Sequence, residues 1–180
     1  MKIIKGILFT IVGIIALLLI TALFTKKEYA VEREVTINKP KSAVFEYIKQ
    51  LKNQDSYSVW ATRDPNMKKE FKGLDGTVGF VSSWDSEKKE VGKGEQEIKK
   101  IAEGERIDFE LRFIKPFEAT DNAYMVTESA GDNQTKVKWG FNGKMKYPMN
   151  LMLLFVNMDE MLGKDLATGL SNLKTQLEKQ

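Results

Sequence analysis

The sequence of 180 residues contains neither cysteine nor histidine. Without cysteine the chain can form no disulfide and offers no thiol nucleophile. Without histidine it lacks the usual general base near neutral pH and the commonest nitrogen ligand of zinc. These absences exclude Ser-His-Asp and Cys-His catalysis. The chain also shows no glycine-rich phosphate loop, no cluster of metal ligands and no nucleophile elbow. We therefore expect no metal and no cofactor, and the residues alone name no catalytic group.

An excess of one charge is also missing. The chain carries 28 basic and 25 acidic side chains, and two of the basic ones, Lys2 and Lys5, precede the first apolar run. Elsewhere lysines and acids are interspersed, which is typical of a solvated surface. A nucleic-acid-binding domain would concentrate basic residues on one face. The sequence therefore predicts no nucleic-acid partner.

One long apolar run is present at residues 6–24, GILFTIVGIIALLLITALF, and it contains no charged residue. As a helix it would be about 28 Å long, close to the hydrocarbon core of a bilayer. A cleaved signal peptide is the alternative, but its apolar core is shorter, about 7–15 residues, and is followed by small residues at the cleavage site. No clear site of that kind follows Phe24. We expect a retained transmembrane anchor, so that the lipid bilayer is one partner.

The anchor divides the chain into a short tail (residues 1–5), the transmembrane helix (6–24), a juxtamembrane linker (25–28) and one folded domain (29–180). Lysines flank the apolar run on both sides. More basic residues follow the run than precede it, and a simple count by the positive-inside rule places the domain in the cytoplasm. Some of these residues belong to the folded domain, however, so the side of the membrane stays open.

The folded domain begins with a strand and short helices. Residues 29–37, YAVEREVTI, alternate between a largely apolar and a polar face, which predicts a strand. Pro40 suits the start of a helix. Residues 42–51 then place apolar side chains on one helical stripe, and the aromatic and polar stretch 53–66 predicts a second short helix or turn.

Strand signals follow in quick succession. Strands are expected at residues 67–72, 77–84, 95–102, 106–114, 119–129 and 135–144. The turn signal Asp75-Gly76 separates the first two. Residues 106–114 alternate clearly, and this pattern directs Phe113 inward and Glu110 and Arg112 toward solvent.

The C-terminal residues 148–180 predict one long helix, with Pro148 at its first position. From Met158 an apolar stripe recurs at helical spacing; it consists of Met158, Met161, Leu162, Leu166, Leu170, Leu173 and Leu177. Gly163 and Gly169 lie inside the predicted helix, where each lowers helix stability by about 1 kcal/mol relative to alanine. Close packing or room for a ligand would explain these glycines, and packing is favoured. A helix with such a face needs the apolar side of a sheet.

This order of elements resembles the START-like helix-grip, or SRPBCC, superfamily, and within it the polyketide cyclase/dehydrase and lipid-transport group of small bacterial proteins. The segments that carry the resemblance are VTINKPKSAVFEYI, GKGEQEI, RIDFELRFIKP, TKVKWGFNG and GKDLATGLSNLKTQLE, together with Trp60. They span roughly residues 29–178. The resemblance implies an α+β fold in which a curved antiparallel sheet of about seven strands wraps around a long C-terminal helix, with two short helices at one end. It also implies a bacterial inner or plasma membrane as the location.

In this superfamily the binding site is a cavity between the sheet and the long helix. The resemblance therefore makes large aromatic and flexible apolar side chains candidates for the cavity wall, although each of them could equally be ordinary core. The candidates are Trp60, Trp84, Phe113, Trp139, Met158, Met161 and Leu162. Asp55, Tyr57 and Tyr124 could act as acids or bases, but the sequence gives them no convergent geometry.

Three functions remain open at this stage. The first is a membrane-anchored binding domain for a hydrophobic small molecule or lipid. The second is a cyclase- or dehydratase-like enzyme, which a carboxylate or tyrosine facing the cavity would support. The third is a membrane-associated interaction protein without catalysis, which a filled core would support. The sequence determines neither the ligand nor the oligomeric state.

Overall fold

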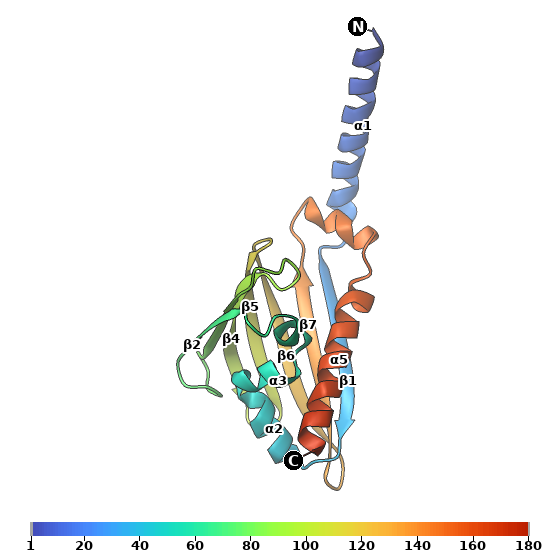
Figure 1. Cartoon of the computed structure of the whole chain (residues 1–180). Coiled ribbons are helices and arrows are strands. Elements are labelled where there is room, and N and C mark those ends of the chain that lie inside the picture. Colours follow the sequence, from blue (N-terminus) through green and yellow to red (C-terminus); the bar gives the residue numbers. More distant parts are fainter. Residues whose placement is uncertain (1, 180) are drawn as a thin grey trace.

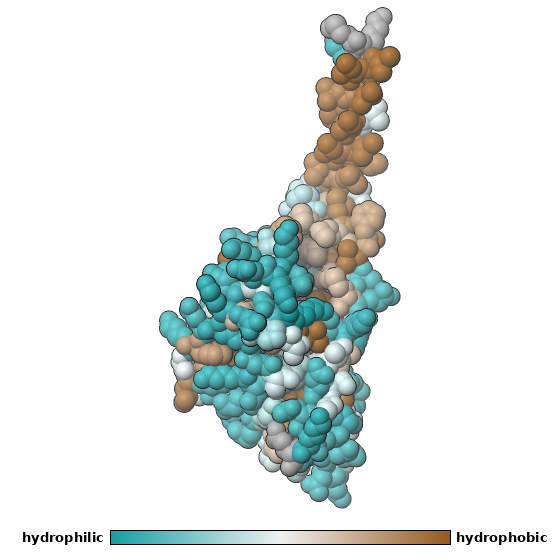
Figure 2. All heavy atoms as spheres, viewed as in Figure 1, coloured by the Kyte–Doolittle hydropathy of each residue, from teal (hydrophilic) through white to brown (hydrophobic). Residues whose placement is uncertain are grey.

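A computed structural model of the chain describes residues 2–179. Helix α1 (Lys2–Phe24) projects from one end of the folded domain (Figure 1). Almost all its apolar side chains are exposed, which distinguishes it from a core helix. The segment Ile3–Phe24 has a mean hydropathy of 3.0 and is long and apolar enough to cross a membrane. The surface of the domain below it is mostly hydrophilic (Figure 2).

Seven strands form one antiparallel sheet in the order β1-β7-β6-β5-β4-β3-β2. Their bounds are β1 (Glu28–Ile37), β2 (Lys68–Lys72), β3 (Val81–Asp85), β4 (Lys93–Ala102), β5 (Arg106–Lys115), β6 (Ala119–Gly131) and β7 (Gln134–Lys144). The predicted α+β class and strand number are confirmed. The strand expected at residues 77–84 was placed too early, because Phe80 N–H donates to Thr77 O in a turn that includes Gly79 at φ +87°.

Short helices close one end of the sheet. They are α2 (Lys41–Lys49), η1 (Leu51–Asn53), α3 (Gln54–Tyr57) and α4 (Val59–Arg63). The stripe predicted for the first of them is buried at Val44, Phe45 and Ile48. The short helix or turn expected at residues 53–66 consists of two helices of four and five residues, α3 and α4, and Tyr57 at the end of α3 is buried in the core.

The C-terminal helix differs from its prediction at its start. Helix α5 runs from Met158 to Glu178, and a separate 3₁₀ helix, η2 (Met149–Leu154), precedes it. Asn157 caps α5, because its Oδ1 accepts hydrogen bonds from the backbone N–H groups of Asp159 (3.1 Å) and Glu160 (3.3 Å). The prediction of one helix from Pro148 was therefore wrong.

The apolar stripe of α5 packs against the inner face of the sheet. Met158 and the leucines at 166, 170, 173 and 177 are buried, as the spacing predicts. Met161 is an exception, since 52% of it is exposed. It lies about 100° around the helix from Leu162, which places it at the edge of the stripe and away from the sheet.

Candidate functional site

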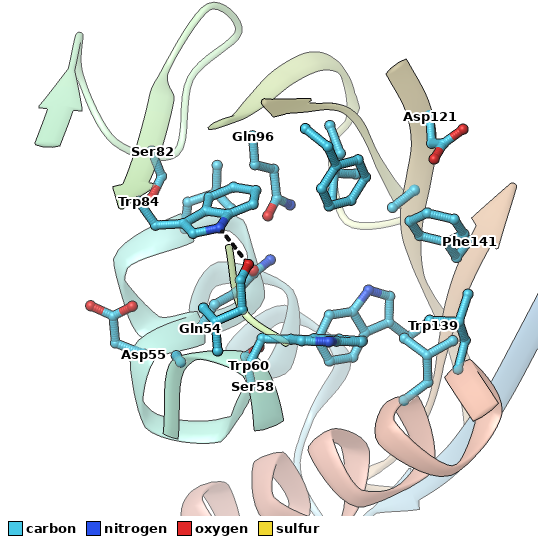
Figure 3. Close-up of a pocket in the computed structure, with 18 of the residues that line it drawn as sticks. Gln54, Asp55, Ser58, Trp60, Ser82, Trp84, Gln96, Asp121, Trp139 and Phe141 are labelled. Atoms are coloured by element: carbon cyan, nitrogen blue, oxygen red, sulfur yellow. Dashed lines mark hydrogen bonds between the residues drawn. The ribbon is translucent and has the colours of Figure 1, made fainter. Parts of the chain in front are cut away.

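A cavity of about 330 Å³ lies between the inner face of the sheet and the N-terminal half of α5 (Figure 3). Helices α3 and α4 form part of its wall, and Leu162 and Leu166 contribute the α5 side. Ligand pockets commonly measure roughly 300–1,000 Å³. The cavity is therefore large enough for a compact ligand.

Aromatic side chains form two opposing walls of the cavity. Trp60 meets Trp139 edge to face, with ring centroids 6.2 Å apart. Across the cavity, Trp84 meets Phe113 in the same manner at 6.1 Å. Figure 3 shows Trp84 on one side and Trp60 and Trp139 on the other. Such walls favour an apolar ligand body, because ring faces and edges provide large contact areas.

Most of the candidate residues from the sequence converge on this cavity. It is lined by Trp60, Trp84, Phe113, Trp139, Met158 and Leu162. Met161 is not among the lining residues, in keeping with its exposed position on α5. Trp139 also belongs to the core, with 5% of its surface exposed, so packing and lining the cavity are not alternatives for this residue.

Glycines allow two of the tryptophans to take these positions. A Cβ atom at Gly94 would lie 2.7 Å from the Trp84 ring, and one at Gly169 would lie 2.8 Å from the Trp139 ring. Both distances are too short for non-bonded carbon atoms. Gly163 has a different role, since its missing Cβ makes room for the Arg33 guanidinium. Both glycines of α5 therefore serve close packing, as predicted.

A row of inward-facing polar residues crosses the sheet at the level of the cavity. The strand register pairs Asp121 with Leu111, Leu111 with Gln96, and Gln96 with Ser82. All four line the cavity. We call Asp121, Gln96 and Ser82 the polar row. The sequence prediction missed this row, although Gln96 and Asp121 occupy positions two residues from the buried Ile98 and Ala123, on the inward side of their strands.

Asp121 is the acidic member of the polar row and is buried. Its Oδ1 accepts a hydrogen bond of 2.9 Å from the backbone N–H of Lys144. Burial raises the pKa of the Asp121 carboxyl above its ordinary value, and the hydrogen bond from Lys144 opposes this rise. The inner wall of the cavity thus contains a carboxyl group that binds its proton at a higher pH than an exposed aspartate does.

Tyr29 is near the same end of the cavity. Its ring lies over Gly143, where a Cβ atom would come within 2.2 Å of the ring. Burial, together with the nearby charge of Asp121, raises the pKa of Tyr29 to about 12. The phenol therefore stays protonated near neutral pH and can donate a hydrogen bond.

Gln54 provides a further polar group from α3 and points into the space between the aromatic walls (Figure 3). Its Nε2 atom is buried and forms no hydrogen bond of standard geometry within residues 2–179. The amide lies beside the Tyr57 hydroxyl and opposes the rise that burial gives to the pKa of Tyr57. Because Nε2 has almost no accessible surface, it lies behind the cavity wall.

The acid–base candidates from the sequence do not converge. Asp55 lines the cavity but forms a salt bridge of 2.7 Å with Lys69. Tyr57 is fully buried, and its hydroxyl contacts Met125 Sδ at 3.6 Å. Tyr124 lies on the outer face of the sheet, where it donates to Glu32 Oε2 at 2.6 Å. Glu110 and Arg112 lie on the same outer face, as predicted, and form an ion pair there. Within the described residues no group of acids could hold a metal ion.

Comparisons with known proteins identify the fold. No protein-family model and no curated protein matches the chain. Among solved structures, it is similar to major latex-like protein 151 from Panax ginseng, with a TM-score of 0.58 and 12% identity over 84% of this chain and 98% of that one. Protein CV1439 from Chromobacterium violaceum gives a TM-score of 0.59 at 11% identity, covering 83% and 96% of the two chains. Ara h 8.0201 gives 0.57 at 14% identity, covering 85% and 99%.

These likenesses extend over nearly the whole length of each solved chain. At such low identity they establish the fold and leave the activity open. The seven-stranded sheet, the long C-terminal helix and the short helices agree with that assignment. The folded domain has a START-like helix-grip fold.

Proposed function

We propose that this chain is a membrane-anchored binding protein for a small hydrophobic molecule. The observation that carries the proposal is the cavity between the sheet and α5, with its aromatic walls and few polar groups. This combination is typical of ligand pockets, in which apolar contact supplies affinity and polar groups fix orientation. A filled core, the basis of the third alternative, is absent from this part of the domain.

The size and polarity of the cavity restrict the ligand. At about 330 Å³ it is near the lower end of the usual range of roughly 300–1,000 Å³. It suits one ring system or one acyl chain better than a complete two-chain phospholipid. The polar row, Tyr29 and Gln54 favour a ligand with hydroxyl, carbonyl or amide groups, because each of these can pair with a buried polar side chain.

Helix α1 would hold this domain at a membrane. Its length and composition suit a single membrane span. Strand β1 begins at Glu28, four residues after the helix ends at Phe24. The domain must therefore remain next to the lipid surface.

Identification of co-purified molecules tests the proposal. The full chain would be extracted from membranes into polymer nanodiscs without detergent, and its small molecules identified by mass spectrometry. The matched control is the Ala123→Leu variant, because Ala123 lines the cavity. We expect a compact apolar molecule in the wild-type sample that is depleted in the variant. If the two samples hold the same molecules, and a panel of fatty acids and polycyclic compounds does not bind, the proposal is wrong.

A cyclase- or dehydratase-like enzyme is the second candidate, and Asp121 favours it. A buried carboxyl with a raised pKa can transfer protons inside an apolar cavity. In that case Asp121→Asn would abolish turnover of a polyketide-like substrate and preserve its binding. Binding without turnover in the wild-type chain would leave the carrier function as the better account.

A further inference from the structure

The junction between α1 and the domain carries an apolar surface that the binding cavity does not explain. The segment 147–155, which includes η2, lies beside the end of α1 (Figure 1). We call this segment the shoulder. Its exposed apolar side chains are Tyr147, Met149, Met152, Leu154 and Phe155. Figure 2 shows apolar surface continuing from α1 onto this part of the domain. Contiguous exposed apolar surface commonly marks an interaction site.

Hydrogen bonds fix the shoulder to α1. The last carbonyl groups of a helix have no partner within the helix. Here the buried Asn150 side chain donates through Nδ2 to Ala22 O at 2.7 Å and to Thr25 O at 3.0 Å. A backbone bond of 2.8 Å from Met145 N–H to Lys27 O continues the connection. The shoulder is therefore held at the level where α1 ends.

Exposed lysines surround the shoulder. Lys26 and Lys27 follow α1, and Lys144 and Lys146 precede η2. Only Lys144 forms a salt bridge among the described residues, at 2.9 Å from Glu28. Basic side chains beside a membrane surface attract anionic lipids. Apolar side chains flanked by lysines are also typical of segments that lie in the membrane interface.

A groove runs beside the shoulder and borders the binding cavity. It is lined by the end of α1, the start of β1 and the segment Leu153–Asp159. Two of its lining residues, Tyr29 and Met158, also line the cavity. The two spaces therefore share a wall at these side chains, on the side of the domain that faces α1.

We propose that the shoulder is a second membrane contact, which inserts into the interface of an anionic bilayer and holds the groove against the lipid. The proposal rests on the proposed anchoring by α1. Continuity with α1 and the surrounding lysines favour lipid over a protein partner. The domain would then have one fixed orientation on the membrane, and a hydrophobic ligand could pass between bilayer and cavity beside Tyr29 and Met158.

Fluorescent labelling tests this contact, and the absence of cysteine permits a single label at any chosen site. The variants are Leu154→Cys in the shoulder and Leu74→Cys as its matched control. Both leucines are exposed, at 56% and 74%, but Leu74 lies in the connection between β2 and β3, far from α1. A third variant, Leu18→Cys, reports on α1 itself. The full chain is labelled with an environment-sensitive dye and placed in nanodiscs containing phosphatidylglycerol.

We expect blue-shifted emission at position 154, with several-fold stronger quenching by shallow nitroxide lipids than at position 74. Equal quenching of both labels by aqueous iodide would overturn the proposal. A shielded label at 154 that nitroxide lipids do not quench would overturn it in favour of a protein partner or a second copy. Failure of deep nitroxide lipids to quench the label at 18 would instead show that the anchoring itself is wrong.

Discussion

The two halves of α5 lie over the same sheet, but one half packs in a filled core and the other lines a cavity. In the C-terminal half, Leu170, Leu173 and Leu177 are each at most 4% exposed and belong to a continuous core. In the N-terminal half, Met158, Leu162 and Leu166 line a void. We call these the filled half and the hollow half. The helix supplies similar side chains to both, so the difference must come from the sheet.

The inward residues of the strands differ between the halves. Near the filled half the sheet presents Ile37, and the same core contains Ile107 and Met125; all three side chains are completely buried. In the hollow half it presents Ala123 and the polar row between the aromatic walls formed by Trp84, Phe113 and Trp139. Small side chains leave space, and polar side chains there remain available for hydrogen bonds. A binding site has thus formed where the sheet does not fill the volume under the helix.

Polar groups in the two halves follow the same division. Thr127 and Thr135 lie on the inner face near the filled half, and each donates its hydroxyl proton to a backbone carbonyl, at 2.9 Å and 2.7 Å. In the hollow half, Gln54 Nε2 has no partner within the described residues. Buried polar groups without partners destabilise a protein by about 1–3 kcal/mol each. The hollow half therefore carries a cost in stability that the filled half avoids.

The largest expected effect is on the free energy of unfolding, when one leucine in each half is shortened to alanine and the two losses are compared. Leu170→Ala should destabilise the domain by about 2–5 kcal/mol, because it creates a cavity in a packed core. Leu162→Ala should cost below about 2 kcal/mol, since Leu162 is only partly buried and already borders empty space. Urea unfolding of the full chain in nanodiscs, followed by tryptophan fluorescence, measures both changes. Equal losses would mean that the two halves are packed alike.

Filling the hollow half should remove binding with a small effect on stability. Ala123→Leu adds three carbon atoms at the cavity wall and should weaken binding of the co-purified molecule at least about tenfold, or 1.4 kcal/mol. The control is Val126→Leu, which changes the outer face of the same strand. Titration of intrinsic fluorescence is suitable, because Trp60, Trp84 and Trp139 line the cavity. Unchanged affinity in Ala123→Leu would place the binding site elsewhere.

Local patterns predicted much of this architecture. Alternation along residues 106–114 correctly directed Glu110 and Arg112 outward, and the leucine spacing in α5 correctly identified its buried face. The start of α5 was missed, because the sequence pattern stays apolar from Met149 onward and does not show that Asn157 caps a new helix. Capping depends on backbone geometry that apolar periodicity does not contain.

The polar row could not be predicted in the same way. Alternation alone places Gln96 and Asp121 on inward faces. Their approach to one cavity depends on the register between neighbouring strands, which alternation does not determine and which pairs Leu111 with both of them. Likewise, Met161 was expected in the cavity wall from its hydrophobicity and spacing, but the rotation of α5 relative to the sheet exposes it. Strand register decided the first case and helix rotation the second.

The smallest expected effect concerns Asp121 and the pH dependence of stability. Its folded-state pKa is raised by burial, so the folded state binds this proton more tightly than the unfolded state. The stability linked to this group is then complete below its unfolded pKa of about 3.9 and is lost as the pH rises through the folded value. Asp121→Asn removes the ionisation, and its side-chain oxygen can still accept the Lys144 N–H. The variant should therefore be at least as stable as the wild type at pH 7, and the difference should shrink as the pH falls toward about 4. Urea unfolding at a series of pH values measures this difference. A variant that is less stable at pH 7 by more than about 1 kcal/mol would show that the charged carboxylate stabilises the hollow half, contrary to its description as a site prepared for a ligand.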